Sequence, residues 1–222
     1  MKNKINSFLF ILFSFLLISI DSAAQPFIED IQAFKKQDSI SMPAKNQILL
    51  VGSSSFTMWN DVQSYFPNYP IINRGFGGSS LPDVIRYKED VVFKYCPKQI
   101  IIYCGENDFA GSDTVSVATV VSRFKELFSS IRNECNKVPV AYVSMKPSPS
   151  RMHLMPKFAA ANEEIQQFLA TQKRTAYIDV YNKMLKKDGT PMDDIFLEDD
   201  LHMNAKGYAI WQEAMKPYLI KN

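Results

Sequence analysis

The sequence has few of the residues from which metal sites are built. Its 222 residues include two histidines, His153 and His202, and three cysteines, Cys96, Cys104 and Cys135. Zinc sites made from these residue types use spacings such as CxxC or HExxH, and neither spacing occurs here. We therefore expect no zinc site built from these residues, and histidine-dependent catalysis has two candidate residues.

The sequence also has little net charge. The formal charge is +2, with 46% hydrophobic and 22% charged residues. This composition is typical of a globular protein and excludes a disordered or collagen-like chain. Domains that bind nucleic acids are usually strongly basic, so we expect no nucleic-acid partner. The composition does not indicate an oligomeric state.

Long hydrophobic runs are confined to the N-terminus. A basic start at Lys2 and Lys4 precedes an uncharged, mostly apolar stretch at 5–20, and the small residues Ser22 and Ala24 follow. This order is typical of a secretory signal peptide. The alternative is a membrane anchor, but sixteen uncharged residues fall short of the roughly 20 that span a bilayer.

We therefore predict a signal peptide at 1–24, cleaved after Ala24. The remainder, 25–222, is long enough for one domain. The product is expected to be exported to the periplasm or the cell exterior, without a stable membrane anchor.

Short apolar runs alternate with longer amphipathic stretches. The runs predict five strands, at Gln47–Val51, Pro70–Asn73, Gln99–Tyr103, Val138–Ser144 and Thr175–Val180. Their nearly continuous hydrophobicity is typical of parallel strands buried on both faces. Helices are expected at Ile28–Lys36, Leu81–Tyr95, Thr114–Asn133 (capped by Asp113), Pro156–Thr171 and Ala205–Tyr218. Strand–helix alternation predicts a three-layer α/β/α sandwich with a five-stranded parallel sheet.

Ligands of such sheets bind beyond the carboxyl ends of the strands. Polar and glycine-rich segments stand at those ends: GSSS from Gly52, RGFGGS from Arg74, GEND from Gly105, and further on DDLH from Asp199. We expect these segments to meet at one edge of the sheet, where they would form the functional site.

The chemistry of these segments suits acyl transfer. Asp199 stands three residues before His202, so its carboxylate can orient the imidazole as a base, with Ser54 as the nucleophile. An exposed, functionless Asp/His pair is the alternative. Asn107 and the glycines from Gly75 to Gly78 can supply N–H donors to a developing oxyanion. A phosphate-binding loop is less favoured there, because the GxxxxGK[ST] lysine is absent.

The four blocks GSSS, NRGFGG, GEND and DDLH, in this order, resemble the SGNH (GDSL) hydrolase superfamily. The resemblance runs from Gln47 to Tyr218 and implies a flavodoxin-like sandwich without a cofactor. By position it implies the nucleophile Ser54, the base His202 with its partner Asp199, and three oxyanion donors. These donors are the Ser54 N–H, Gly78 and Asn107, with Gly77 as a second candidate for the glycine.

One position departs from the family pattern. Ser53 stands where the family usually has Asp, directly before Ser54. The sequence therefore does not indicate which contacts support the loop that carries Ser54.

Four other residues near the expected site are candidates for substrate binding: Arg74, Lys146, Arg151 and His153. Arg74 could instead tie down its own loop, and the segment that contains His153 could be a solvated loop. Cys96 and Cys135 each stand three residues before a predicted strand. If those strands are neighbours, an exported protein permits a Cys96–Cys135 disulfide.

Together these features predict an exported serine esterase. Its substrates would carry small acyl groups, such as O-acetyl groups on saccharides. A lysophospholipase or thioesterase for longer acyl chains is one alternative, and a catalytically silent saccharide-binding protein is another. For an enzyme, activity should fall at acidic pH, because a protonated imidazole cannot accept the serine proton.

Overall fold

The computed structural model describes residues 25–221. The predicted signal peptide at 1–24 lies outside the described residues. The five predicted strands are present as one all-parallel sheet in the order β2-β1-β3-β4-β5. Their bounds are β1 Ile48–Gly52, β2 Ile71–Gly75, β3 Gln99–Tyr103, β4 Val140–Val143 and β5 Thr175–Ile178.

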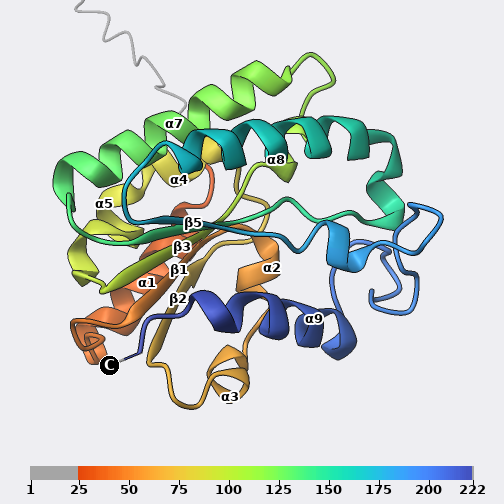
Figure 1. Ribbon diagram of the computed structural model, residues 1–222. Coiled ribbons are helices and arrows are strands. Elements are labelled where there is room, and N and C mark those ends of the chain that lie inside the picture. Colours follow the sequence, from red (N-terminus) through yellow and green to blue (C-terminus); the bar gives the residue numbers. More distant parts are fainter. Residues whose placement is uncertain (1–24, 222) are drawn as a thin grey trace, which may run out of the picture.

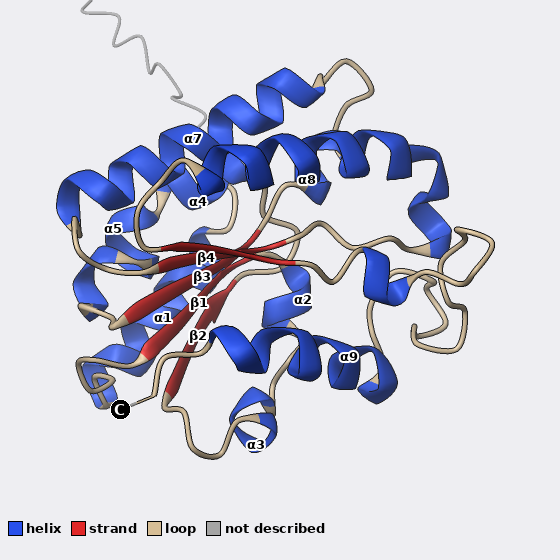
Figure 2. Cartoon of the chain, in the orientation of Figure 1, coloured by secondary structure: helices blue, strands red, loops and turns tan. Residues whose placement is uncertain are grey.

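Helices cover both faces of the sheet, which confirms the three-layer α/β/α prediction (Figures 1 and 2). On one face pack α1 (Ile28–Ile40), α4 (Leu81–Arg86), α5 (Lys88–Val91), α7 (Val117–Glu134) and α8 (Met155–Ala170). On the other face pack α2 (Ser54–Thr57), α3 (Val62–Tyr65) and α9 (Ala205–Met215). The short α6 (Glu106–Ala110) follows β3 directly.

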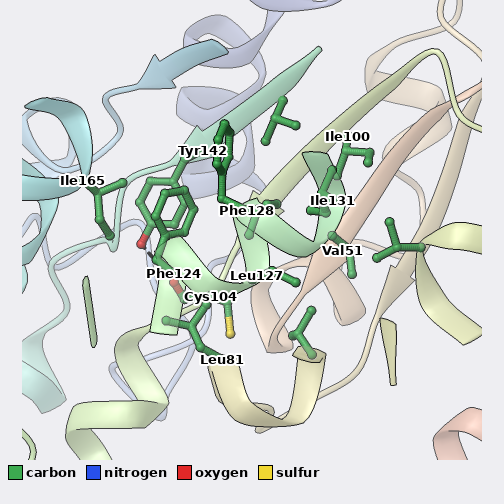
Figure 3. Packing of buried hydrophobic residues seen from close by; sticks show 14 of the residues in the cluster. Val51, Leu81, Ile100, Cys104, Phe124, Leu127, Phe128, Ile131, Tyr142 and Ile165 are labelled. Atoms are coloured by element: carbon green, nitrogen blue, oxygen red, sulfur yellow. Dashed lines mark hydrogen bonds between the residues drawn. The ribbon is translucent and has the colours of Figure 1, made fainter. Parts of the chain in front are cut away.

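The alternation of side chains along each strand explains why the apolar runs are continuous. In β3, Ile100 and Ile102 pack beneath α7 and α8, whereas Ile101 and Tyr103 face α9. All these side chains are buried because each face of the sheet is covered. Figure 3 shows the core between the sheet and α7, where the Phe124 ring of α7 lies against Tyr142 of β4. The centroids of these two rings are 4.9 Å apart.

Two local predictions were wrong. The expected helix at Leu81–Tyr95 is divided into α4, α5 and a 3-10 turn at Phe93–Tyr95, with non-helical backbone at Tyr87 and Val92. The apolar residues Leu81, Val84, Val91 and Val92 of this segment are nevertheless buried.

The second wrong prediction concerns a helix cap. α7 is capped by Ser116, whose Oγ accepts a hydrogen bond from the Thr119 N–H at 3.1 Å, and not by Asp113. Both residue types are good caps, and α7 begins at Val117, three residues later than the sequence predicted.

The topology determines where a site can form. The strand order reverses between β1 and β3, and the loops after these strands diverge to opposite faces of the sheet. Such a switch point opens a crevice at the carboxyl ends of the strands. In the described part of the chain, no helix is long and apolar enough to cross a membrane.

Candidate active site

The end of β1 places Ser54 at the switch point. Gly52, the last residue of β1, has a φ of +136°, and a Cβ built there would lie 1.9 Å from the Tyr103 carbonyl oxygen. Only glycine permits this close approach of β1 to β3. The chain turns at Ser53, and α2 begins with Ser54 at the rim of the crevice.

A short loop before α9 carries the expected base. The two ends of the loop are paired through a bridge between Phe196 and Met203 and a hydrogen bond from the Leu197 N–H to the His202 carbonyl at 2.7 Å. Within the loop, Asp199 Oδ1 accepts hydrogen bonds from the backbone N–H groups of Leu201 and His202. Its other oxygen, Oδ2, lies 2.5 Å from His202 Nδ1.

This arrangement determines how the imidazole can act. Burial raises the pKa of Asp199, but the hydrogen bonds from His202 and from the loop backbone outweigh it and lower the pKa to about 2. The carboxylate is therefore ionised throughout the pH range in which histidine titrates. It holds Nδ1 as a donor, which leaves Nε2 of His202 free to accept a proton.

Asn107, the second residue of α6, presents its amide at the same edge. Its Nδ2 donates to Ser53 Oγ at 2.7 Å and to the Ser79 carbonyl at 3.0 Å. Ser79 in turn donates from Oγ to the Gly52 carbonyl at 3.2 Å. The loops after β1, β2 and β3 are thus joined through one amide. Ser53, which departs from the family pattern, takes part in this support.

Two backbone N–H groups near the start of α2 and in the loop after β2 are free to donate to a ligand. Within the described residues, no hydrogen bond uses the N–H groups of Ser54 or Gly78 as donors. Gly78 has a φ of +82°, a conformation that favours glycine. Gly77, the second candidate, lies next to Ser54, since a Cβ built on it would be 4.0 Å from the Ser54 Cβ. Both glycines therefore remain candidates for the oxyanion donor.

Ser54 and Asn107 line one cleft. Its walls include Ser53, Ser54, Gly105, Asn107 and Leu201, the residue that precedes His202. Within residues 25–221 the Ser54 hydroxyl makes no hydrogen bond, to His202 or to any other group. The Ser54 hydroxyl and the Asn107 amide thus lie at one crevice, and the loop that carries the oriented His202 imidazole borders it through Leu201.

Comparison with known families decides the assignment. The model of the GDSL-like lipase/acylhydrolase family matches residues 46–210, about three quarters of the chain, which include all four sequence blocks. The chain belongs to the GDSL-like lipase/acylhydrolase family.

Solved structures share this GDSL fold at low sequence identity. A GDSL-like lipase from Bacteroides thetaiotaomicron is 18% identical, with a TM-score of 0.72 over 85% of this chain and 96% of that one. A lipase/acylhydrolase from Enterococcus faecalis is 20% identical, with a TM-score of 0.62 over 80% and 98% of the two chains. A carbohydrate esterase family 3 protein from Talaromyces cellulolyticus is 16% identical, with a TM-score of 0.60 over 78% and 95%. A search of curated proteins found no match to this chain.

The GDSL cleft also contains a buried ion cluster that the sequence did not predict. Glu106 is buried, and its Oε2 accepts from Lys146 Nζ at 3.3 Å and from Arg151 Nη1 at 3.1 Å. Its Oε1 accepts from the Tyr103 hydroxyl and from the Lys146 N–H. Burial raises the pKa of Glu106, but the charges of Lys146 and Arg151 outweigh it and hold the pKa below its usual value.

The same cluster accounts for two of the residues predicted to bind substrate. Lys146 is only 1% exposed and is turned toward Glu106. Arg151 lies on the 3-10 helix η2 (Pro149–Leu154) and is partly exposed at the cleft wall. Its Nη2 donates to Asn107 Oδ1 at 2.9 Å.

The other two predicted substrate-binding residues lie elsewhere. Arg74 is buried outside the cleft, where it pairs with Asp38 at 2.6 Å and donates to the Tyr95 hydroxyl at 2.6 Å. It therefore joins β2 to α1 and to the 3-10 turn. His153 is exposed on η2 and does not line the cleft.

The cysteines are free thiols, so the structure contradicts the predicted Cys96–Cys135 disulfide. Both residues precede neighbouring strands, as expected. However, Cys96 is exposed, whereas Cys135 packs against the hydrophobic core.

Within residues 25–221, no group of three or more His, Cys, Asp or Glu side chains is arranged to hold a metal ion.

Proposed function

We propose that this GDSL-family protein is an exported serine esterase that hydrolyses carboxylic esters through an acyl-Ser54 intermediate. The observation that carries the proposal is the Asp199–His202 pair, held by its loop beside a cleft that Ser54 and Asn107 line. A carboxylate on Nδ1, a free Nε2 and nearby amide donors suit a serine nucleophile.

The proposed reaction has two steps. Ser54 Oγ attacks the ester carbonyl while His202 Nε2 takes the hydroxyl proton, and the carbonyl oxygen becomes an oxyanion. Asn107 Nδ2 and the N–H groups of Ser54 and Gly78 donate to that oxygen. Collapse of the intermediate breaks the ester C–O bond, and the imidazolium protonates the leaving alcohol. Water, activated by His202, then releases the acid and restores Ser54.

Small acyl groups are the proposed substrates, with O-acetyl groups on saccharides as the main candidate. The cleft is mostly polar, with serine, glycine and charged side chains in its walls. A structural neighbour is a carbohydrate esterase, and the predicted export would bring the enzyme to extracytoplasmic polysaccharides.

One observation favours longer acyl chains. Met152 of η2 and Leu197 of the His202 loop are 48% and 42% exposed. Their segments are joined, because the Ser150 N–H and hydroxyl both donate to the Asp200 carbonyl. Exposed apolar side chains on the joined segments would suit a lysophospholipid or a long-chain thioester.

The mechanism is tested with a fluorophosphonate probe on purified protein. We expect labelling of the wild type and of a matched surface variant, Ser64→Ala, and none of Ser54→Ala. Labelling that persists in Ser54→Ala would contradict the assigned nucleophile. A folded wild type that resists the probe would favour the silent saccharide-binding protein.

Acyl-chain preference is measured on p-nitrophenyl esters. We expect the highest kcat/KM for acetate and a decline as the chain lengthens. A maximum of kcat/KM at about eight carbons or more would exclude the acetyl proposal and support the lipase-like alternative.

Signal-peptide cleavage is tested by N-terminal sequencing of the exported protein. We expect its sequence to begin at Gln25, and an exported protein that retains Met1 would contradict cleavage.

A further inference from the structure

The hydrogen bonds of Asn107 leave only one orientation for its amide group. Arg151 Nη2 lies on the Oδ1 side, and a guanidinium can only donate. The Ser79 carbonyl lies on the Nδ2 side, and a carbonyl can only accept. Reversing the amide would place two donors together on one side and two acceptors together on the other. Arg151 and Ser79 therefore jointly point Nδ2 into the cleft.

Arg151 is itself held at two points. Nη1 donates to Glu106 and Nη2 donates to Asn107, so the planar guanidinium bridges neighbouring residues of α6. Glu106 is fixed by the Lys146 side chain and the Tyr103 hydroxyl. The guanidinium thus has little freedom to turn, and its side chain is only 18% exposed.

We propose that Arg151 is a positioning residue for the oxyanion hole: it fixes the direction of the Asn107 amide and strengthens its N–H donor. A hydrogen bond from a cation to Oδ1 polarises the amide, and charge-assisted bonds are stronger than neutral ones. One N–H of Nδ2 is held by Ser79, and the other points to Ser53 Oγ, beside the nucleophile Ser54. In the reaction, that second N–H serves the oxyanion. The inference rests on the proposed esterase function.

This role differs from direct binding of an anionic substrate by Arg151. A substrate-binding arginine acts mainly on KM and does so whether or not Asn107 is present. A positioning arginine acts on kcat, since the oxyanion forms only in the transition state. Its effect disappears when the amide that it positions is removed.

The kinetic test is a double-mutant cycle with p-nitrophenyl acetate. Loss of one oxyanion donor costs about 10²–10³ in kcat, and we expect Asn107→Ala to fall in this range. We expect Arg151→Met to lower kcat about tenfold with KM changed less than about threefold, because the donor is misdirected but still present. In the Asn107→Ala background, Arg151→Met should change kcat less than about twofold.

Two matched variants sharpen the kinetic test. Arg151→Lys retains a positive charge near Glu106, but one ammonium group cannot replace the two-point contact of the guanidinium. We expect it to resemble Arg151→Met. Arg86→Met changes an exposed arginine of α4 and should leave kcat unchanged. Full activity of Arg151→Lys, a tenfold effect of Arg151→Met that persists without Asn107, or an effect confined to KM would each overturn the proposal.

A second measurement does not depend on catalysis. The side-chain ¹⁵N–¹H signals of Asn107, assigned by their loss in Asn107→Ala, should be shifted and protected from exchange in the wild type. In Arg151→Met they should move toward the values of a free amide, and in Arg86→Met they should stay. Unmoved signals in Arg151→Met would overturn the positioning role even in an active enzyme. If the esterase proposal fails in the fluorophosphonate test, these signals still report whether Arg151 orients Asn107.

Discussion

Two buried ion clusters in this protein have the same composition and different surroundings. Each has one carboxylate, one arginine, one lysine and one tyrosine. The first is centred on Asp38 of α1, which accepts from Arg74, Lys94 and Tyr95. The second is centred on Glu106 of α6, with Lys146, Arg151 and Tyr103.

The difference lies in what else each arginine touches. Arg74 completes its bonds inside the fold, and its guanidinium packs between the rings of Phe34 and Tyr95, 5.0 Å and 4.9 Å from their centroids. Arg151 gives one of its bonds to Asn107 at the cleft. The first cluster joins α1 to β2 and the 3-10 turn, whereas the second connects the core to the proposed oxyanion hole.

The lysines also differ, which sets the order of the expected effects. The side chain of Lys146 is 2% exposed, whereas that of Lys94 is 29% exposed. If its carboxylate partner is removed, Lys94 can turn toward water and keep its charge solvated. Lys146 cannot do so without opening the core.

The largest effect on stability is therefore expected from Glu106→Gln. Loss of the carboxylate leaves the Lys146 ammonium buried without a counter-charge, which typically costs about 3–5 kcal/mol. Arg151 loses one of its two anchors, so the folded variant should also have a lower kcat. Urea unfolding and initial rates with p-nitrophenyl acetate measure the two effects.

The control for this prediction is the double variant Glu106→Gln/Lys146→Met. Removing the stranded ammonium should restore at least half of the lost stability, since apolar replacements of buried ion pairs are often tolerated. It should not restore kcat, because Arg151 still lacks its anchor on the Glu106 carboxylate. No recovery of stability would show that the buried lysine is not the source of the loss.

A smaller effect is expected from Asp38→Asn. Lys94 can reach solvent, and Arg74 keeps its bond to the Tyr95 hydroxyl and its two ring contacts. We expect a loss of roughly 2–3 kcal/mol in the free energy of unfolding and an unchanged kcat. A drop in kcat comparable to that of Glu106→Gln would contradict the division of the two clusters into a structural and a functional one.

The two clusters also show what could be predicted from the sequence. The strands were predictable, because burial on both faces makes runs such as Gln99–Tyr103 apolar throughout. Ser54, Asn107, Asp199 and His202 were predictable as candidates, because each stands in a short block after a strand or before a helix. In both cases the signal lies within a few neighbouring residues.

The ion clusters carry no such local signal. Asp38 lies 36 residues from Arg74, and Glu106 lies 40 and 45 residues from Lys146 and Arg151. Which carboxylate meets which cation depends on how α1, β2, α6 and η2 pack. The sequence accordingly suggested Arg74, Lys146 and Arg151 as substrate contacts, although three-dimensional packing pairs all of them with buried carboxylates.

The smallest expected effect is a pH dependence that the two clusters share. At Asp38 and at Glu106, burial raises the pKa, but the neighbouring cations and hydrogen bonds outweigh it, so both pKa values are lowered in the folded protein. In the unfolded chain, carboxyl groups titrate near pH 4. The stabilisation by these carboxylates is therefore fully present above about pH 4 and is lost as the pH falls through their lower pKa values in the folded protein.

The free energy of unfolding of the wild type should decline below about pH 4. The difference in free energy of unfolding between the wild type and each of the variants Asp38→Asn and Glu106→Gln should become smaller in the same range. An advantage that stays constant from neutral pH to pH 3, measured by urea unfolding, would mean that neither carboxylate stabilises the fold through its charge.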